Sequence, residues 1–165
     1  MTLYANHQWN EQFSSALNLS QISDRYDYTS IAYGVSDTSR YETKNQQISL
    51  QNQWNSRLGI WNFGASHLHQ TLDSTVGFLA KSRNTDSAWM GYQYEQNRHH
   101  LQLNGRFDRL SDLNSKNFLT GAINYVYDIT PAWRVLAGYS NGFAAPSFNQ
   151  LYYPPYCYGG YCFDS

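Results

Sequence analysis

Two cysteines near the end of the printed sequence are the side chains with the clearest potential for chemistry. Cys157 and Cys162 bracket a Tyr-Gly-Gly-Tyr stretch. A pair of cysteines that closes a Gly-Gly turn forms a loop disulfide in an oxidising compartment. A metal site here would need further ligands, and none is adjacent in the sequence. The spacing therefore predicts a Cys157–Cys162 disulfide.

Other polar groups could support metal binding or ion pairing. His67 and His69 lie two residues apart and share one face of a strand. That spacing could begin a metal site, but histidines facing a lumen or an interface are commoner, and we predict no metal. Arg106, Asp108 and Arg109 predict salt bridges on the polar side of a sheet. No nucleophile paired with a base and no glycine-rich phosphate loop is visible, so catalysis is not predicted.

The composition is unusual for a soluble globule. The chain has 165 residues, of which 17% are aromatic and only 14% are charged, whereas a soluble domain averages about 25% charged residues. Its net charge of −1 leaves no basic footprint for nucleic acid. Mean hydropathy is −0.63, and no run approaches the roughly 18 apolar residues of a membrane helix. A transmembrane β-barrel fits this mixture, because only every second residue of its strands meets lipid.

Hydrophobic periodicity favours strands almost everywhere. In residues 100–109 Leu101, Leu103 and Phe107 alternate with strongly polar residues, which is the period-two pattern of a strand with one apolar face. We expect this apolar set to lie on the outer face. About eight strands are predicted in this way: residues 3–9, 13–26, 41–54, 58–70, 87–96, 100–109, 118–128 and 133–141.

The predicted connections alternate between short and long. Short turns are expected at residues 9–12, 55–57, 95–99 and 128–132, and long loops at 27–40, 71–87 and, more briefly, 110–116. Four tryptophans lie near the short turns: Trp9, Trp54, Trp61 and Trp133. Outer-membrane barrels have short turns at one rim, long loops at the other and aromatic girdles at the membrane surfaces. The pattern therefore predicts an all-β antiparallel meander in the bacterial outer membrane, with a soluble β-sandwich as the alternative.

One motif carries a family resemblance. Gly142-Phe143-Ala144-Ala145-Pro146-Ser147-Phe148-Asn149-Gln150-Leu151-Tyr152 resembles the G-[FY]-[KR]-A-P-[ST]-x-x-E-L-Y segment of TonB-dependent outer-membrane receptors. Ala144 and Gln150 depart from that pattern. Gln before Leu-Tyr, the strand Asn62-Phe63-Gly64-Ala65 and the loop spacing are most similar to the vitamin B12 (cobalamin) receptor branch. The motif residues Gly142, Phe143, Ala145, Pro146, Leu151 and Tyr152 are expected to be structural.

The resemblance implies an architecture larger than this sequence. Such receptors have barrels of about 22 strands filled by a plug domain. We therefore expect residues 1–165 to be a partial barrel domain from the middle of a receptor, without the plug and the C-terminal strands. A complete eight-stranded barrel is the alternative.

The segment after the last predicted strand has two interpretations, as a structural elbow or as a ligand contact. Pro146 removes a ladder donor, which ends regular pairing, and it biases Ala145 towards extended geometry. We expect Ser147, Asn149 and Gln150 to satisfy backbone groups or to face the lumen, while Phe148, Leu151 and Tyr152 pack the turn against the loop. A structural elbow explains this segment without any ligand contact, and it is the favoured interpretation.

The resemblance also implies a function. We expect a non-enzymatic receptor in the bacterial outer membrane that binds cobalamin and is energised by TonB with ExbB and ExbD through the plug. Asp27, Tyr28 and Thr43, on the first long loop and its return, are candidate ligand contacts, with solvated loop residues as the alternative. No cofactor is expected in this segment, although the full receptor could hold calcium. A siderophore or haem receptor and a small barrel or adhesin without transport remain alternatives.

Overall fold

The structure is a computed structural model, and it describes residues 1–32, 34–78, 81–112, 116–152, 156–158 and 161–163. Eight strands follow one another: β1 (Thr2–Gln8), β2 (Phe13–Ala32), β3 (Val35–Ser56), β4 (Gly59–Ser74), β5 (Ser82–Gln96), β6 (His99–Leu110), β7 (Lys116–Thr130) and β8 (Trp133–Asn141). Helix α1 (Phe148–Tyr152) and the hairpin of β9 (Tyr156–Tyr158) and β10 (Tyr161–Phe163) come next. Within these described ranges, no helix is long and apolar enough to cross a bilayer.

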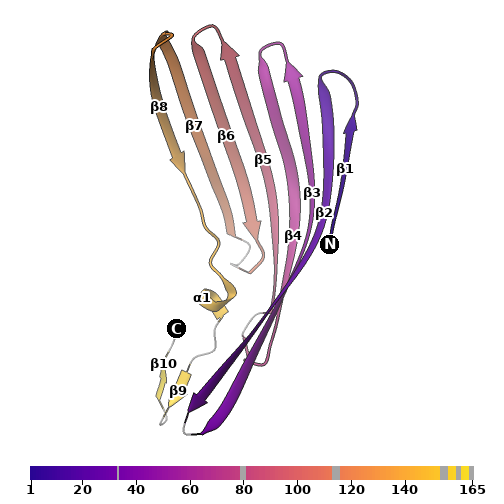
Figure 1. Ribbon diagram of the computed structural model, residues 1–165, viewed down its shortest axis with the longest axis vertical. Helices are drawn as coiled ribbons and strands as arrows, with labels where there is room; N and C mark the ends of the chain where they lie inside the picture. Colours follow the sequence, from indigo (N-terminus) through magenta and orange to yellow (C-terminus); the bar gives the residue numbers. More distant parts are fainter. Residues whose placement is uncertain (33, 79–80, 113–115, 153–155, 159–160, 164–165) are drawn as a thin grey trace.

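The eight strands form one antiparallel meander. Each strand from β1 to β8 pairs with its neighbours in the sequence. Figure 1 shows the sheet with four tight turns at one end and α1 with the β9–β10 hairpin at the other. We call these the short-turn end and the long-strand end. The predicted all-β meander of eight strands is confirmed.

The sheet has one apolar face and one polar face. Residues paired across adjacent strands lie on the same face, and successive residues alternate between faces. One continuous row of pairs runs through Leu17, Leu50, Ala65, Ala88, Phe107 and Leu119. The row beside it runs through Asn18, Ser49, Ser66, Ser87 and Asp108. The two rows define the apolar face and the polar face.

Nothing in the described part of the chain covers the apolar face. Leu119 is 75% exposed and Leu50 is 47% exposed, although both are strongly hydrophobic. A water-facing sheet rarely leaves a continuous apolar surface of this kind. Lipid is the solvent that suits such a face, because a transmembrane barrel turns its apolar residues outward. Leu101, Leu103 and Phe107 share this face, as predicted.

Aromatic residues edge the apolar face towards the short-turn end. Trp54, Trp61 and Tyr92 are paired in one row, and the Trp61 and Tyr92 rings lie 4.4 Å apart. The Tyr92 hydroxyl donates a hydrogen bond of 2.8 Å to the Leu58 carbonyl in the turn. Rings with an apolar body and a polar tip suit the lipid–water boundary. Of the four tryptophans that the sequence analysis placed near the short turns, Trp54 and Trp61 belong to this row, and Tyr92 is an addition to them.

Two of the three predicted long loops are wrong in their extent, whereas the brief connection at 110–116 agrees with β6 ending at Leu110 and β7 beginning at Lys116. Residues 27–40 were expected to form a loop, but β2 continues to Ala32 and β3 begins at Val35. Residues 71–87 are also largely strand, because β4 reaches Ser74 and β5 starts at Ser82. We call residues 22–32 and 35–45 the β2–β3 arm. Figure 1 shows the arm extending beyond the other long hairpins.

Cross-strand pairs explain why the arm stays in strand form. Asp27 is opposite Arg40, and Thr29 is opposite Thr38, whose hydroxyls lie 3.1 Å apart. Apart from a few aliphatic residues near its two ends, such as Ile22, Ile31 and Val35, the arm is polar or aromatic on both faces, so the apolar alternation that identifies a membrane strand is lost there. Backbone pairing does not depend on that alternation. The sequence pattern therefore ended earlier than the strands.

The segment after β8 contains a helix that was not predicted. Pairing ends at Asn141, and α1 begins two residues after Pro146. The Ser147 hydroxyl accepts a hydrogen bond from the Gln150 backbone N–H at 3.3 Å, and the Gln150 side-chain oxygen accepts one from the Ser147 N–H at 2.9 Å. This reciprocal pair is a capping box, which favours a helical turn over an extended elbow.

Candidate functional site

A pocket of about 490 Å³ lies on the polar face at the long-strand end. It is lined by Tyr26, Tyr28, Tyr41, Thr43, Gln70, Leu72, Arg83, Ser147 and Phe148. The first seven come from β2 to β5, and the last two come from residues 142–152, which we call the rim segment. Gln70 and Leu72 lie on the polar face with Ser66, because every second residue of β4 shares a face. Phe148 of the rim segment packs against Leu72, so the rim segment lies over the polar face.

The pocket is aromatic with neutral polar groups between the rings. The Tyr26 and Tyr41 rings are 6.3 Å apart, and Tyr26 and Tyr28 are both largely exposed. Leu72 and Phe148 are buried and form an apolar floor. Such a mixture suits a large ligand with apolar surface and scattered hydrogen-bonding groups.

The structure separates the three residues that the sequence singled out. Tyr28 and Thr43 both line the pocket, although they lie in β2 and β3 rather than in a loop. Asp27 lies on the opposite face of β2, because neighbouring residues in a strand alternate. Its carboxylate contacts Arg25 at 3.1 Å and Arg40 at 2.9 Å.

These contacts account for the charge state of Asp27. Hydrogen bonds from Arg25, and next from Arg40, hold the pKa of the Asp27 carboxyl below its usual value. The carboxylate is therefore ionised and already paired at neutral pH. Its arrangement favours a role in joining the two strands of the arm over ligand contact.

Arg83 anchors the rim segment to the sheet. It projects from β5 beside the pocket and donates a hydrogen bond of 2.8 Å to the Pro146 carbonyl. The Tyr152 hydroxyl donates to the Asp112 carbonyl at 3.0 Å. The Phe143 ring stacks on Phe118 with 3.5 Å between ring centroids.

The remaining motif residues make none of these contacts. Leu151 is half-buried on α1, and Gly142 and Ala145 are exposed. The motif thus places Pro146 and Tyr152 where the sheet can hold them. A structural role is what the sequence analysis expects of these motif residues, and it stays a prediction. Ser147 and Phe148 of the same segment also line the pocket.

A second polar network lies on the polar face nearer its middle. Arg106 contacts Asp108 at 2.9 Å, and its guanidinium lies 5.9 Å from the centre of the Trp89 ring. Ser87 donates to Asp108 at 2.5 Å. The salt bridge expected of Arg106 and Asp108 is present. Arg109 lies on the other face, in register with Asp86, because successive residues of a strand point to opposite faces.

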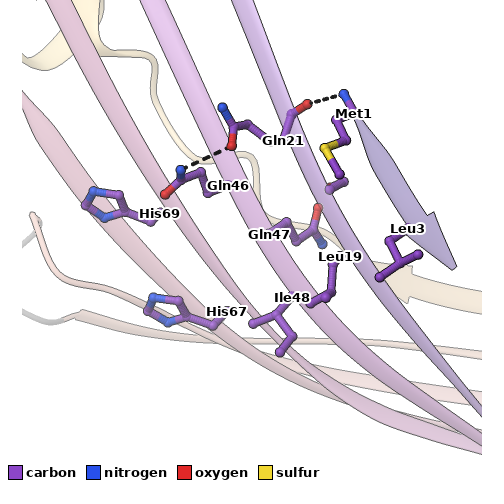
Figure 2. Close-up of a pocket in the computed structure, with 10 residues that line it drawn as sticks. Met1, Leu3, Leu19, Gln21, Gln46, Gln47, Ile48, His67 and His69 are labelled. Carbon is purple, nitrogen blue, oxygen red and sulfur yellow. Dashed lines mark hydrogen bonds between the residues drawn. The ribbon is translucent and has the colours of Figure 1, made fainter. Parts of the chain in front are cut away.

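The hollow in Figure 2 lies mainly on the apolar face, beside the start of β1. Leu3, Leu19 and Ile48 line it, and the Gln46 side chain bonds to that of Gln21 at 3.4 Å. His67 lines it too, and its Nδ1 lies 2.6 Å from the Asp86 carboxylate. Because its walls continue the surface suited to lipid, we do not treat it as the site for a water-borne ligand.

The two cysteines face each other across the last hairpin. Cys157 of β9 pairs in register with Cys162 of β10. Directly opposed Cα atoms in an antiparallel pair are about 4.5–5.5 Å apart, and a disulfide requires about 4.4–6.8 Å. The side chains of these residues lie outside the described part, so the disulfide stays a prediction.

Several pocket residues had no signal in the sequence analysis. Tyr26, Tyr41 and Gln70 lie on strands whose outer ends were assigned to loops, and Arg83 lay inside the supposed loop 71–87. Extending the period-two count past Tyr26 and Gln70 would have placed these side chains on one face. The S-x-x-Q spacing of Ser147 and Gln150 was the available signal for α1.

Fold and surface together define an outer-membrane β-barrel protein. A meander with tight turns at one end, an aromatic girdle and an uncovered apolar face leaves no other common class. Residues 1–163 match the family model described as TonB dependent receptor-like, beta-barrel. The chain belongs to this family, whose members are outer-membrane transporters rather than enzymes. Comparison with curated proteins and with solved structures gave no match.

Proposed function

We propose that this chain forms part of the wall of a receptor that takes up cobalamin across the outer membrane with energy supplied through TonB. The observation that carries the proposal is the pocket between the arm and the rim segment. In outer-membrane barrels the short turns face the periplasm, so the long-strand end faces the exterior, where a scarce nutrient is captured.

The chemistry of the pocket supports a large, mostly neutral ligand. A corrin ring carries amide side arms, for which hydroxyl and amide side chains are suitable partners. Thr43, Gln70 and Ser147 supply such groups between the tyrosines. Arg83 is the one cation among the lining residues, and its charge is paired with Asp112 at 3.4 Å. The pocket therefore offers little net charge to an anionic chelate.

The two edge strands of the sheet are an argument for further strands and a plug domain in the complete receptor. Within the described residues, β1 and β8 each pair on one side only. Unpaired strand edges are not tolerated in a bilayer. We infer that further strands complete the barrel, and that a plug domain couples it to TonB with ExbB and ExbD.

A ferric chelate or haem is the second candidate. Tyr26, Tyr28 and Tyr41 bring three phenol groups to one pocket, and a tyrosine oxygen can serve as an iron ligand. The binding experiment therefore includes iron-containing ligands.

The test is equilibrium binding to the full-length receptor in detergent. Cyanocobalamin, haem and a ferric siderophore are each titrated at up to micromolar concentration. We expect saturable binding of cyanocobalamin alone. Saturable binding of haem or the siderophore without cyanocobalamin binding would move the protein to the second candidate. Binding of none would favour a barrel without transport. Uptake in cells with and without TonB then measures the energy requirement.

A further inference from the structure

Arg83 is the most heavily engaged side chain beside the pocket. Its side chain is 8% exposed. Its Nε and Nη2 donate to the Gln70 side-chain oxygen at 3.1 and 3.0 Å, and its Nη1 donates to the Pro146 carbonyl at 2.8 Å. The same Nη1 lies 3.4 Å from a carboxylate oxygen of Asp112, whose side chain is 3% exposed.

Arg83 also supports an aromatic contact on the rim segment. Its guanidinium lies 5.0 Å from the centre of the Phe148 ring, and Phe148 is buried against Leu72. Tyr152 adds a tie to Asp112, and burial, followed by the nearby Asp112, raises the pKa of the Tyr152 hydroxyl. The guanidinium thus joins β4, β5, the end of β6 and the rim segment at one point.

The rim segment is too short to hold a fixed conformation and position without contacts to the sheet. Helix α1 has five residues, and isolated helices shorter than about 12–15 residues are marginal in water. The capping box of Ser147 and Gln150 fixes the helical turn but bonds only within the segment. Besides the stacking of Phe143 on Phe118, attachment to the sheet depends on Arg83, on Tyr152 and on the buried ring of Phe148.

We propose that Arg83 is a positioning residue that completes the ligand pocket. By holding Pro146 and Phe148 across the polar face, it keeps Ser147 and Phe148 in place among the residues that line the pocket. The part of this proposal that concerns the ligand rests on the proposed function. The part that concerns the rim segment does not.

The chemistry requires arginine rather than a generic cation. A guanidinium has five N–H donors in a planar fork, so one group can bond Gln70 and Pro146 while its flat surface lies near the Phe148 ring. A lysine ammonium is a compact charge and would satisfy Asp112 without spanning the other partners. Arg83→Lys should therefore behave like a loss of the anchor, although it preserves charge.

Two readouts on the full-length receptor test the proposal. The variants are Arg83→Lys, Arg83→Gln and the gentler Tyr152→Phe, with Arg109→Gln as the matched control. Arg109 is an exposed arginine on the opposite face, in register with Asp86. Amide hydrogen exchange of residues 147–152, the part of the rim segment that follows Pro146, measures how firmly that segment is held. Titration with cyanocobalamin measures the pocket, and heat-modifiable migration checks that each variant is folded.

We expect amide exchange of residues 147–152 to rise roughly ten-fold or more in both Arg83 variants, because hydrogen bonds from a charged group are among the strong ones. Tyr152→Phe should raise it less, and Arg109→Gln should leave it unchanged. Cyanocobalamin affinity should fall about ten-fold in the Arg83 variants, since Ser147 and Phe148, which line the pocket, lose their position.

The outcomes separate the two proposals. Unchanged exchange in a folded Arg83 variant overturns the anchoring role. Raised exchange with unchanged affinity overturns the link between the anchor and the pocket. If the wild-type receptor binds no cobalamin, the proposed function fails while the exchange measurement still decides the anchor. If neither Arg83 variant folds, Gln70→Ala decides it, because this variant removes the acceptor of two Arg83 hydrogen bonds and leaves the guanidinium in place, and unchanged exchange of residues 147–152 would count against the proposal.

Discussion

Asp27 and Tyr28 are consecutive residues of β2 that lie on opposite faces of the sheet, the first paired with Arg25 and Arg40 and the second lining the pocket. The sequence analysis named both residues as candidate ligand contacts, but their surroundings in the structure differ. Substituting each in turn separates their roles.

Tyr28→Ala should weaken cyanocobalamin binding about ten-fold, because aromatic side chains at a binding surface commonly contribute 1–2 kcal/mol or more. Asp27→Asn should leave affinity within about two-fold, since exposed ion pairs contribute little. Equilibrium titration of the two variants beside the wild-type receptor measures both. A larger loss for Asp27→Asn would place the ligand on the other face of the arm.

Lipid exposure of the apolar face can be tested at adjacent positions of β3. Leu50 belongs to the apolar row, and Gln51 lies on the polar face. Leu50→Arg should destabilise the folded receptor in lipid vesicles by about 2–4 kcal/mol if that position is near the bilayer midplane. Gln51→Arg should cost far less. Urea unfolding monitored by tryptophan fluorescence gives the difference, and equal costs would contradict the assignment of faces.

Gly64 makes room for the Trp89 ring on the neighbouring strand. A Cβ at Gly64 would come within 2.5 Å of that ring and also meet the Leu50 carbonyl. Gly64→Ala should therefore lower the free energy of unfolding by roughly 1–3 kcal/mol. Gly105→Ala is the control, because a Cβ there meets nothing within 4 Å. The same unfolding assay applies, and a neutral Gly64→Ala would show that Trp89 can move away.

Asp128 gives the short-turn end a dependence on pH. Hydrogen bonds from Arg134, and next from His100, lower the pKa of the Asp128 carboxyl from its ordinary value of 3.8. A lowered pKa in the folded state adds stability above pH 3.8, and that stability disappears as the pH falls through the folded-state pKa. Wild type should therefore melt above Asp128→Asn at pH 7, and the two melting temperatures should converge in acid.

Melting curves of the two proteins between pH 7 and about pH 2 test this sign. A difference that grows towards low pH would contradict it. Glu42, whose pKa is lowered chiefly by Lys44, is remote from this turn and should respond equally in both proteins.

The disulfide prediction is tested by counting thiols. If Cys157 and Cys162 are bonded, oxidised and denatured receptor should show no free sulfhydryl from this pair, and reduction should release two. The register of β9 and β10 makes the bond geometrically accessible. Two free thiols before reduction would refute the bond.

The sequence predicted the membrane part of the fold better than the site. Where lipid meets one face, alternation is strict, and strands such as β6 were placed within a residue or two of their bounds. In the β2–β3 arm neither face carries a regular apolar alternation, so the strands continue without a signal and were assigned to a loop. Tyr28 and Thr43 were chosen by resemblance, whereas Arg83 became visible only once its contact with Pro146 was known.

The anchor also bears on the order in which this chain folds. Every strand pairing in the sheet joins sequence neighbours, so the meander can assemble one hairpin at a time with short loop closures. The contact of Arg83 with Pro146 instead spans 63 residues and requires β5 to β8 to be in place. Closing a long loop costs entropy that is repaid only when the contact forms. We therefore expect the barrel wall to be assembled first and its pocket to be completed last.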